Sequence, residues 1–502
     1  MVGQPNGLGD TLRAATYGSR VITVSLLLTA LILKQASAAN FPVPDTGNAF
    51  SNGAALVAAI NAAQTTIGDD IVVLDAGATY SLDHADNSIN GLPIITTGIT
   101  VRGGYTATGA LTTISMVRDA EAPGFRVFAV AAAGRLKLDS LRITNGALAS
   151  GPFTTFYHGT AVRNDGGSVH LFRSELSENV GVAIANMNAG STGMMTIEES
   201  TVRDNRSQVS VAGIYNEGTL TLDRSTVASN SGGEYLGDGG PGGITSTLGD
   251  IRIVNSTVSG NQSNGLLGGS GILGGILIRG GRASIEFSTI AMNAGLGIMV
   301  YGGDVTVTNS ILDRNGVPDP ANPFSTVRID CGGTLTSGGH NILGSASSSA
   351  GNCGFIASST DFVGSETLPF DARLDRLASN GGFTQTHALL PASPAVAAAV
   401  DSRGGCPAID QRNESRPRFP EPCDIGAYQT RGTDCRTNGW CTLEPMALLC
   451  ASRPNYCRMT ILPGIAKYIP MFPPLDRPVL DCRIDGPGCG PWRSEGFPTT
   501  RP

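Results

Sequence analysis

Apolar and polar residues alternate in short runs along the middle of the chain, and one such run recurs six times. In one copy, Leu220 and Leu222 lie two positions apart, and Ser225, Val227 and Asn230 follow at steps of three, two and three. A period of two is typical of a β-strand, whose successive side chains point to opposite faces. The copies share Ser174, Ser200, Ser225, Ser256, Ser288 and Ser310, and Asn179, Asn205, Asn230, Asn261, Asn293 and Asn315.

The spacing inside a copy is constant, whereas the step between copies varies from 22 to 32 residues (310 − 288 and 288 − 256). Constant strands joined by elastic loops are typical of a solenoid, in which each repeat is one coil and insertions leave through outer loops. The sequence therefore predicts an all-β fold, a single-stranded right-handed parallel β-helix. Its strands should stack about 4.8 Å apart.

The repeated serine and asparagine need a physical role. In stacked coils an asparagine at a bend lies above the asparagine of the previous coil, and its amide can donate and accept hydrogen bonds along the stack. The serine can do the same more weakly at the other bend. We therefore expect two internal structural ladders, with Asn315, near one end, contributing less than Asn230. The alternative is an exposed row of asparagines that binds sugar or ice.

The N-terminal side of the array has its own signals. Residues 52–65 predict a short amphipathic helix with Asn52 as its N-cap. Such a helix would cover strand edges that are otherwise unpaired at the open end of the solenoid. A seventh copy, containing Ser140 and Asn145, precedes the array and is out of register by one residue.

Composition fits this architecture. The chain has 502 residues, including 67 glycines, and only 15% of its residues are charged. High glycine and low charge suit a turn-rich solenoid. The net charge is −7 and no basic stripe is present, so nucleic acid is excluded as an expected partner.

The N-terminus has the features of a secretory signal. Two arginines precede an apolar run over residues 21–33, and an Ala-Ser-Ala site ends at Ala38. The run is shorter than the roughly 20 residues that span a bilayer. We expect cleavage of residues 1–38, and hence an exported protein that is not integral to a membrane. An uncleaved anchor is the alternative.

All ten cysteines lie after residue 330, so in an exported chain disulfides would stabilise the C-terminal part. Three prolines between residues 318 and 323 mark the expected exit from the β-helix. We therefore assign the β-helix with its N-terminal cap to residues 39–325, a further region to 326–430 and a Cys/Pro-rich tail to 431–502. The six tail cysteines allow 15 connectivities, none of which the sequence favours.

Two stretches of the C-terminal part resemble the bacterial choice-of-anchor Q domain proteins. One runs from Asn380 to Tyr428 and includes the words NGGFTQTHALLPASPA and CDIGAY; the other runs from Cys331 to Cys353. Proteins of that family are exported and carry a parallel β-helix similar to pectate lyase or to the repeats of polymorphic outer-membrane proteins. The resemblance implies surface association and no defined reaction.

The resemblance also implies a disulfide arrangement. Cys331 should pair with Cys353, and Cys406 with Cys423, because each pair brackets one family word. Residues 326–430 would then be the choice-of-anchor Q-like region. The tail departs from the family pattern, since it contains neither a hydrophobic sorting helix nor a cell-wall sorting word.

Candidates for catalysis are few. Lyases on such scaffolds use a basic residue beside acidic calcium ligands, and hydrolases use converging carboxylates. We expect adjacent acids and bases to form solvated pairs along the stack. Because neighbours along an extended strand point to opposite faces, they should not both meet one substrate atom. The candidates are Asp204 with Arg203 and Arg206, Asp223 with Arg224, and Asp313 with Arg314.

The histidines add little to this picture. The Tyr-His-Gly word at His158 is only weakly similar to the Gly-His-Gly word of polygalacturonases, whose other motifs are missing here. His340 and His387 lie in family words and are expected to be structural. We therefore expect no catalytic residue, no metal site and no cofactor.

The sequence thus predicts an exported, non-catalytic β-helix protein at the outer surface of a bacterium or secreted from it. Its expected role is adhesion or scaffolding, with surface glycans or a host or neighbouring cell as partners. One alternative is a polysaccharide lyase or glycoside hydrolase carried on the β-helix. The other is a passive surface-layer protein without a specific ligand.

Overall fold

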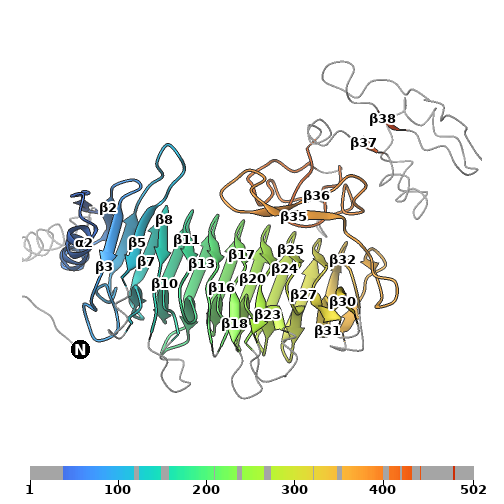
Figure 1. Cartoon of the computed structure of the whole chain (residues 1–502), viewed down its shortest axis with the longest axis horizontal. Coiled ribbons are helices and arrows are strands. Elements are labelled where there is room, and N and C mark those ends of the chain that lie inside the picture. Colours follow the sequence, from blue (N-terminus) through green and yellow to red (C-terminus); the bar gives the residue numbers. More distant parts are fainter. Residues whose placement is uncertain are drawn as a thin grey trace, which may run out of the picture.

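The computed structural model describes residues 38–117, 124–148, 158–208, 210–233, 240–264, 273–319, 322–346, 353–399, 406–418, 421–431, 441–442 and 479–480. The expected signal peptide up to residue 37 and most of the expected tail lie outside these residues. The described chain is an elongated stack of short strands with a helix at one end and a C-terminal region along one side (Figure 1).

The strands of the stack run parallel in three columns. The first column is β1 (Asn40–Val43), β2 (Asp69–Leu74), β4 (Gly98–Arg102), β7 (Arg135–Asp139), β10 (Ser168–Phe172), β13 (Met194–Glu198), β16 (Thr219–Asp223), β20 (Asp250–Val254), β24 (Arg282–Glu286), β27 (Asp304–Thr308), β31 (Cys331–Gly339) and β33 (Cys353–Ile356). The second column is the eleven-stranded sheet of β3 (Thr79–Leu82), β5 (Thr112–Met116), β8 (Leu141–Thr144), β11 (Glu175–Ser177), β14 (Thr201–Arg203), β17 (Thr226–Ala228), β21 (Thr257–Ser259), β25 (Thr289–Ala291), β28 (Ile311–Asp313), β32 (Ile342–Leu343) and β34 (Phe362–Val363).

The third column is β6 (Phe128–Val130), β9 (Val162–Asp165), β12 (Ile184–Met187), β15 (Ile214–Asn216), β19 (Ile244–Ser246), β23 (Leu273–Ile278) and β26 (Leu296–Val300). It joins the first column through the long strand β31, so that the two columns form one 19-stranded sheet. Four short pairs lie outside the columns: β18 (Ser231–Gly233) with β22 (Gln262–Asn264), β29 (Gly316–Asp319) with β30 (Asn322–Arg328), β35 (Leu374–Ala378) with β36 (Thr386–Leu389), and β37 (Cys441–Thr442) with β38 (Val479–Leu480). The chain is a parallel β-helix, as its repeat pattern predicts.

The period-two pattern places the apolar residues inside the coils. Leu220 and Leu222 of β16 are fully buried and align with Met195 and Ile197 of β13 in the parallel register. Each buried aliphatic side chain of this kind contributes roughly 1.5–3 kcal/mol by leaving water. Stacking like on like from coil to coil gives the solenoid one continuous core.

At each of these two corners of a coil, one residue with left-handed backbone conformation directly precedes the repeated serine or asparagine. Arg224 precedes Ser225 with φ of 50°, and Ser229 precedes Asn230 with φ of 55°. Residues other than glycine are strained in this conformation. The strain is tolerated because the turn directs the following residue into the stack.

In the seventh copy the strand is in register with the array, whereas Ser140 and Asn145 are displaced by one residue from the ladder positions, as expected. Leu136 and Leu138 of β7 align with Val169 and Leu171 of β10. The residues at the serine and asparagine positions are Leu141 and Gly146, as shown by the backbone N–H groups with which they bond to Ser174 and Asn179 of the next coil. Ser140 and Asn145 occupy the preceding left-handed positions, with φ of 58° and 63°.

One helix, α2 (Ala49–Ala63), covers the N-terminal end of the stack (Figure 1). It starts earlier than expected, because its cap is Asn48, whose side chain accepts hydrogen bonds from the N–H groups of Phe50 and Ser51. The expected cap, Asn52, is buried instead and donates a hydrogen bond to the backbone of β3. The helix protects strand edges that would otherwise be open.

The β-helix extends past residue 325, where the sequence placed its end. Pro318 and Pro323 lie in the antiparallel pair β29–β30, which leaves the stack as an insertion. The chain then returns through β31 and adds β32, β33 and β34 to the columns. Prolines therefore marked a long loop between two coils, as variable insertions in solenoids allow.

Candidate functional site

The six repeated asparagines form an unbroken internal ladder. Asn230 donates from its backbone N–H and its amide Nδ2 to Oδ1 of Asn261, at 3.1 and 2.9 Å, and from Nδ2 to the carbonyl of Val202 at 3.0 Å. Its own Oδ1 accepts the same pair of bonds from Asn205. All six side chains are at most 1% exposed, so none of them faces a ligand in solvent.

We had expected the ladder to end near Asn315, but it continues by one more residue. Asp330, which lies on the far side of the β29–β30 insertion, accepts hydrogen bonds at Oδ1 from the backbone N–H and Nδ2 of Asn315, at 2.9 and 2.8 Å. Its Oδ2 accepts from the N–H of Ser345 at 2.8 Å. A carboxylate can take the acceptor half of the asparagine role, but it cannot donate onward.

The serine column works in the same way at the other corner. The backbone N–H of Ser225 donates to Oγ of Ser256 at 3.1 Å, and Oγ of Ser225 donates to the carbonyl of Ile197 in the previous coil. The last serine, Ser310, donates its N–H to Oδ1 of Asn341 at 3.0 Å. These serines are buried, so the column is a structural part of the β-helix.

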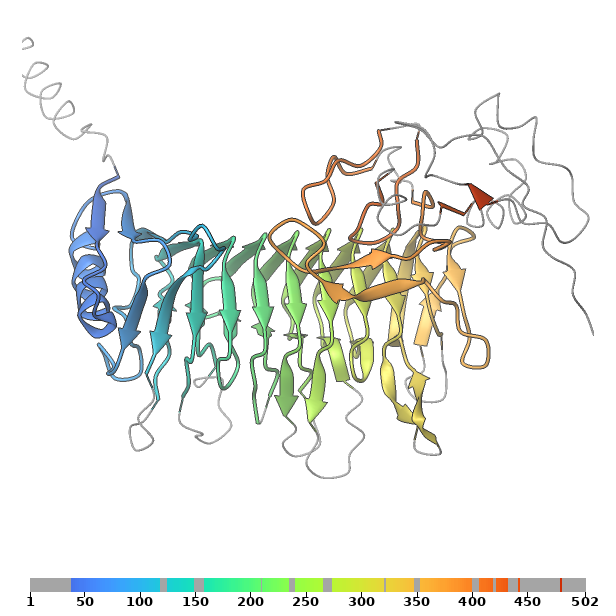
Figure 2. The same cartoon turned by 45° about the horizontal axis from the view of Figure 1, so that its top comes forward.

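The C-terminal region packs along one side of the stack, over the eleven-stranded sheet (Figures 1 and 2). Gln411, which is 1% exposed, donates from Nε2 to Oγ1 of Thr226 at 2.9 Å and accepts at Oε1 from Oγ1 of Thr257 at 2.6 Å. His387 bonds through Nε2 to Oγ of Ser259 at 2.8 Å. Threonine and serine hydroxyls on the two successive strands β17 and β21 are thus hydrogen-bonded by the chain itself.

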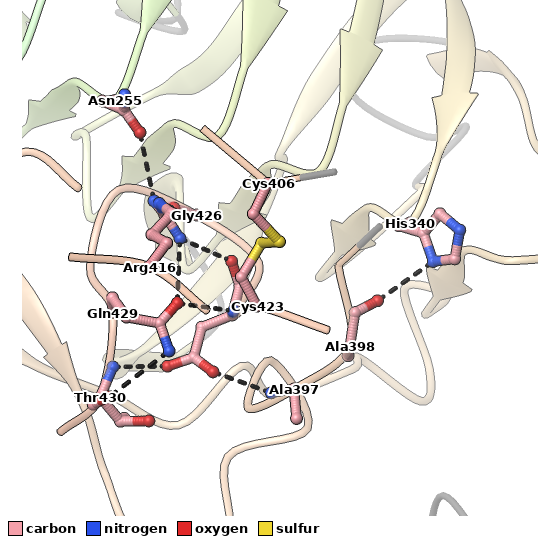
Figure 3. Close-up of a disulfide and its surroundings, with 11 residues drawn as sticks. Asn255, His340, Ala397, Ala398, Cys406, Arg416, Cys423, Gly426, Gln429 and Thr430 are labelled. Atoms are coloured by element: carbon pink, nitrogen blue, oxygen red, sulfur yellow. Dashed lines mark hydrogen bonds between the residues drawn. A yellow bond between two sulfur atoms is a disulfide. The ribbon is translucent and has the colours of Figure 1, made fainter. Parts of the chain in front are cut away.

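The Cys406–Cys423 disulfide closes the segment that contains Gln411 (Figure 3). Inside that segment the buried Arg416 donates to Oδ1 of Asn255 at 3.2 Å and to the carbonyl of Gly426 at 2.7 Å. Burial lowers the pKa of Arg416 to about 10, which leaves it charged near neutral pH. The other disulfide, Cys331–Cys353, joins β31 to β33.

An ion-pair network lies on the part of the sheet that this region leaves uncovered. Oε1 of Glu175 contacts Nε of Arg142 at 3.3 Å and Nη2 of Arg203 at 2.9 Å. Arg142 also donates to Oε1 of Glu178 at 2.6 Å, and Arg203 pairs with Asp204. The network therefore links three successive coils through alternating charges.

A hollow of about 560 Å³ adjoins this network. It lies where β5, β8, β11 and β14 end, along the asparagine corner. Ser115, Met116, Val117, Asn145, Glu178, Asn179, Val180, Asp204 and Arg206 line it. Of the candidates from the sequence, this brings Asp204 and Arg206 together, while Arg203 holds Asp204 from the side.

Asp223 and Arg224 meet directly, contrary to our expectation for strand neighbours. Nη1 of Arg224 lies 2.5 Å from Oδ2 of Asp223, and its Nη2 lies 2.6 Å from Oε1 of Glu198 in the previous coil. The left-handed turn at Arg224 ends the extended strand and brings both side chains to one side. Burial raises the pKa of Asp223, although the guanidinium of Arg224 opposes this.

Asp313 is buried beneath the C-terminal region and does not face solvent. Its carboxylate contacts Arg328 at 3.3 Å and Arg314 at 3.8 Å, and accepts a hydrogen bond from the N–H of Ala372 at 3.1 Å. Burial raises the pKa of Asp313 to about 6. These contacts attach the C-terminal region to the stack.

The three histidines discussed above are held inside the protein. Burial, together with Arg163 and Arg126, lowers the pKa of His158 to about 4, and its ring packs edge-on against Tyr215. His340 contacts the carbonyl of Ala398 at 3.1 Å. Burial also lowers the pKa of His387. None of these rings lines the hollow.

Two further properties bear on function. Within the described ranges, no group of three or more His, Cys, Asp or Glu side chains is placed to hold a metal ion. No helix in those ranges is both long and apolar enough to cross a membrane.

Comparisons with known proteins leave the family open. No protein-family model matches the chain, and no curated protein sequence matches it. The crystal structure of pectate lyase Pel9A is similar, with 15% sequence identity and a TM-score of 0.47, over 79% of this chain and 98% of that chain. We draw no functional conclusion from so distant a likeness, and the choice-of-anchor Q resemblance stays a prediction.

Sequence reasoning missed Glu175, Glu178 and Arg142, which complete the ion-pair network. The sequence contained a pattern that could have identified them. Arg142 and Arg203 lie at outward strand positions two residues apart in the seventh and second copies. Glu178 directly precedes Asn179, as Asp204 precedes Asn205. Residues that share an offset from the ladder share a face of the stack. Comparing outward offsets across copies, in addition to neighbours within one copy, would have found them.

Proposed function

We propose that this protein is an exported bacterial β-helix of the cell surface or the secreted fraction, and that it binds its partner without cleaving it. The support for export is the signal-like N-terminus together with disulfides in the C-terminal region. The choice-of-anchor Q resemblance supports a surface role. Adhesion or scaffolding is the function that these features favour.

One observation carries the non-catalytic part of the proposal. The carboxylates on the uncovered face, Glu175, Glu178 and Asp204, each pair with an arginine. A general acid needs a raised pKa and a general base needs access to its proton. Carboxylates that arginines hold in place are suited to accept hydrogen bonds from a bound ligand.

The test is an activity assay on the purified full chain. Incubation with pectin, alginate, chondroitin and xylan, with and without calcium, should release neither unsaturated nor reducing ends. Separation of the culture medium, the washed cell surface and the cytoplasm of the producing bacterium should place the protein in one of the first two. Release of product that vanishes in Asp204→Asn would overturn the proposal and make the chain an enzyme.

The exposed carboxylates of Glu178 and Asp204 favour one second candidate function, a glycoside hydrolase. Both line the hollow and lie in adjacent coils, and hydrolases act through two carboxylates that flank a glycosidic bond. A hydrolase would show reducing-end release without calcium, which separates it from a lyase in the same assay.

A further inference from the structure

The hollow at the asparagine corner has the position and size of a ligand site. It is formed by the ends of four successive strands, β5, β8, β11 and β14, and measures about 560 Å³. Sites for small molecules occupy roughly 300–1,000 Å³. None of the residues that line the hollow comes from the described C-terminal region, which bonds to the sheet at β17 and β21.

Two carboxylates are fixed at one side of the hollow. Glu178 and Asp204 hold the same left-handed corner position in consecutive coils, with φ of 59° and 54°. Their backbones are therefore one strand spacing apart, about 4.8 Å. Arg142 holds Glu178 at 2.6 Å and Arg203 holds Asp204, so both acceptors are preorganised while their side chains stay 54% and 43% exposed.

A donor and an apolar floor complete the lining. Arg206 is exposed and makes no ion pair with any described residue, so its guanidinium is available to a ligand. Met116 is 2% exposed, and Val117 and Val180 lie beside it in the lining. The hollow therefore offers paired acceptors, a charged donor and an apolar surface within one small volume.

This combination selects among ligand classes. Two carboxylates disfavour phosphates and polyanions, and Arg206 disfavours a bare metal cation. A pyranose ring carries hydroxyls that both donate and accept, together with C–H groups that pack on apolar side chains. We propose that the hollow binds one ring of a neutral saccharide, an inference that rests on the proposed binding function and adds the place and the ligand class to it.

The test is titration calorimetry of the full chain with neutral xylo-, cello-, manno- and galacto-oligosaccharides, and with oligogalacturonate. We expect one of the neutral series to bind and the uronate to bind more weakly. Arg206→Ala and Asp204→Ala should each weaken binding at least 10-fold, because hydrogen bonds to charged groups are the strong ones. Asp204→Asn, which keeps an acceptor, should lose less.

The matched control is Glu286→Gln. Glu286 is also ion-paired, with Arg252 at 3.2 Å, but it lies outside the hollow, so this variant should bind like the parent. Circular dichroism of each variant checks that it is folded.

The outcomes separate the two proposals. Binding of a neutral sugar that is unaffected by Arg206→Ala and Asp204→Ala would keep the binding function and overturn the site. Tighter binding of oligogalacturonate, dependent on Arg206, would overturn the ligand class. Failure of every saccharide to bind would overturn this inference; failure of the wider function requires that binding to whole cells is also absent.

Discussion

At the scale of single residues, the asparagine ladder shows why one side chain recurs at a fixed position. Asn230 makes hydrogen bonds to both neighbouring coils, because an amide donates at one end and accepts at the other. Buried backbone groups need such partners, since leaving one unpaired costs about 1–3 kcal/mol. Serine, with a shorter side chain, hydrogen-bonds to both neighbouring coils at the other corner.

Replacing Asn230 by Ala should therefore lower the free energy of unfolding by about 1–3 kcal/mol. Asn315→Ala should cost at least as much, since it also removes the Nδ2 donor from the buried carboxylate of Asp330. Urea denaturation of both variants measures this, with Ser229→Ala, at an exposed corner position, as the control. A smaller loss for Asn315→Ala would contradict the ladder's continuation into Asp330.

The acidic end of the ladder makes stability depend on pH. Burial raises the pKa of Asp330 to about 7, helped by Asp313, although bonds from Asn315 and Ser345 oppose it. The folded protein thus prefers the protonated acid. The contribution of this group is fully present below its ordinary pKa of 3.8 and is lost as pH rises through about 7.

The stability of Asp330→Asn relative to the parent should accordingly rise by roughly 1–3 kcal/mol between pH 4 and pH 8, because only the parent has an acid to ionise here. The lost bond from the N–H of Ser345 lowers the stability of the variant at both pH values. Thermal unfolding from pH 4 to 8 measures the difference. Asp313 acts on Asp330 through its charge, so the difference between the two profiles measures this pair of acids together. The same profile for Asp330→Asn and the exposed control Asp304→Asn would count against this reading.

At the scale of elements, the C-terminal region is attached by buried polar side chains and by an apolar cluster that it shares with β25, β28 and β32. Gln411 contacts β17 and β21, and His387 contacts β21, across a sheet face of hydroxyl groups. The strands themselves are held by their own ladders and by the coil core. The attachment and the stack should therefore respond separately to mutation.

Gln411→Ala removes bonds to Thr226 and Thr257 and leaves their hydroxyls buried. We expect faster amide hydrogen exchange in residues 380–416, with exchange in β13 and β16 unchanged. Gln262→Ala, at an exposed position, is the control. Uniformly faster exchange throughout the coils would mean that the C-terminal region is part of the cooperative stack.

At the scale of the whole molecule, Cys331–Cys353 joins two strands at the C-terminal end of the stack and Cys406–Cys423 lies in the C-terminal region, whereas the six repeats contain no cysteine. The Cys406–Cys423 link closes a segment of 17 residue steps, which contributes about 3 kcal/mol in the chain-entropy model. The repeats depend on stacking, in which each coil contacts its neighbours.

Reduction should accordingly expose residues 406–431 to protease before the repeats. Limited proteolysis with and without dithiothreitol, read by mass spectrometry, gives the order of cleavage. The variant Cys406→Ser, without reductant, should match the reduced parent in that segment. Simultaneous loss of the repeats would show that the link supports the whole stack.

The sequence by itself determined the β-helix, its core and its two ladder columns. These follow from a strict period of two and from constant offsets such as those of Ser225 and Asn230, which are local properties of each copy. It did not place the last coils correctly, because the insertion that contains Pro318 interrupts the pattern before Asp330. A local pattern ends where a loop begins, even when the stack continues.

Only the tertiary structure decided which outward side chains meet. Arg224 reaches Asp223 because a left-handed turn replaces the extended geometry that the strand pattern implied. Glu178 and Asp204 lie side by side because their coils stack, although 26 residues separate them (204 − 178). Periodicity fixes the inside of a solenoid coil by coil, whereas its surface chemistry arises between coils, where contacts depend on the register of the stack.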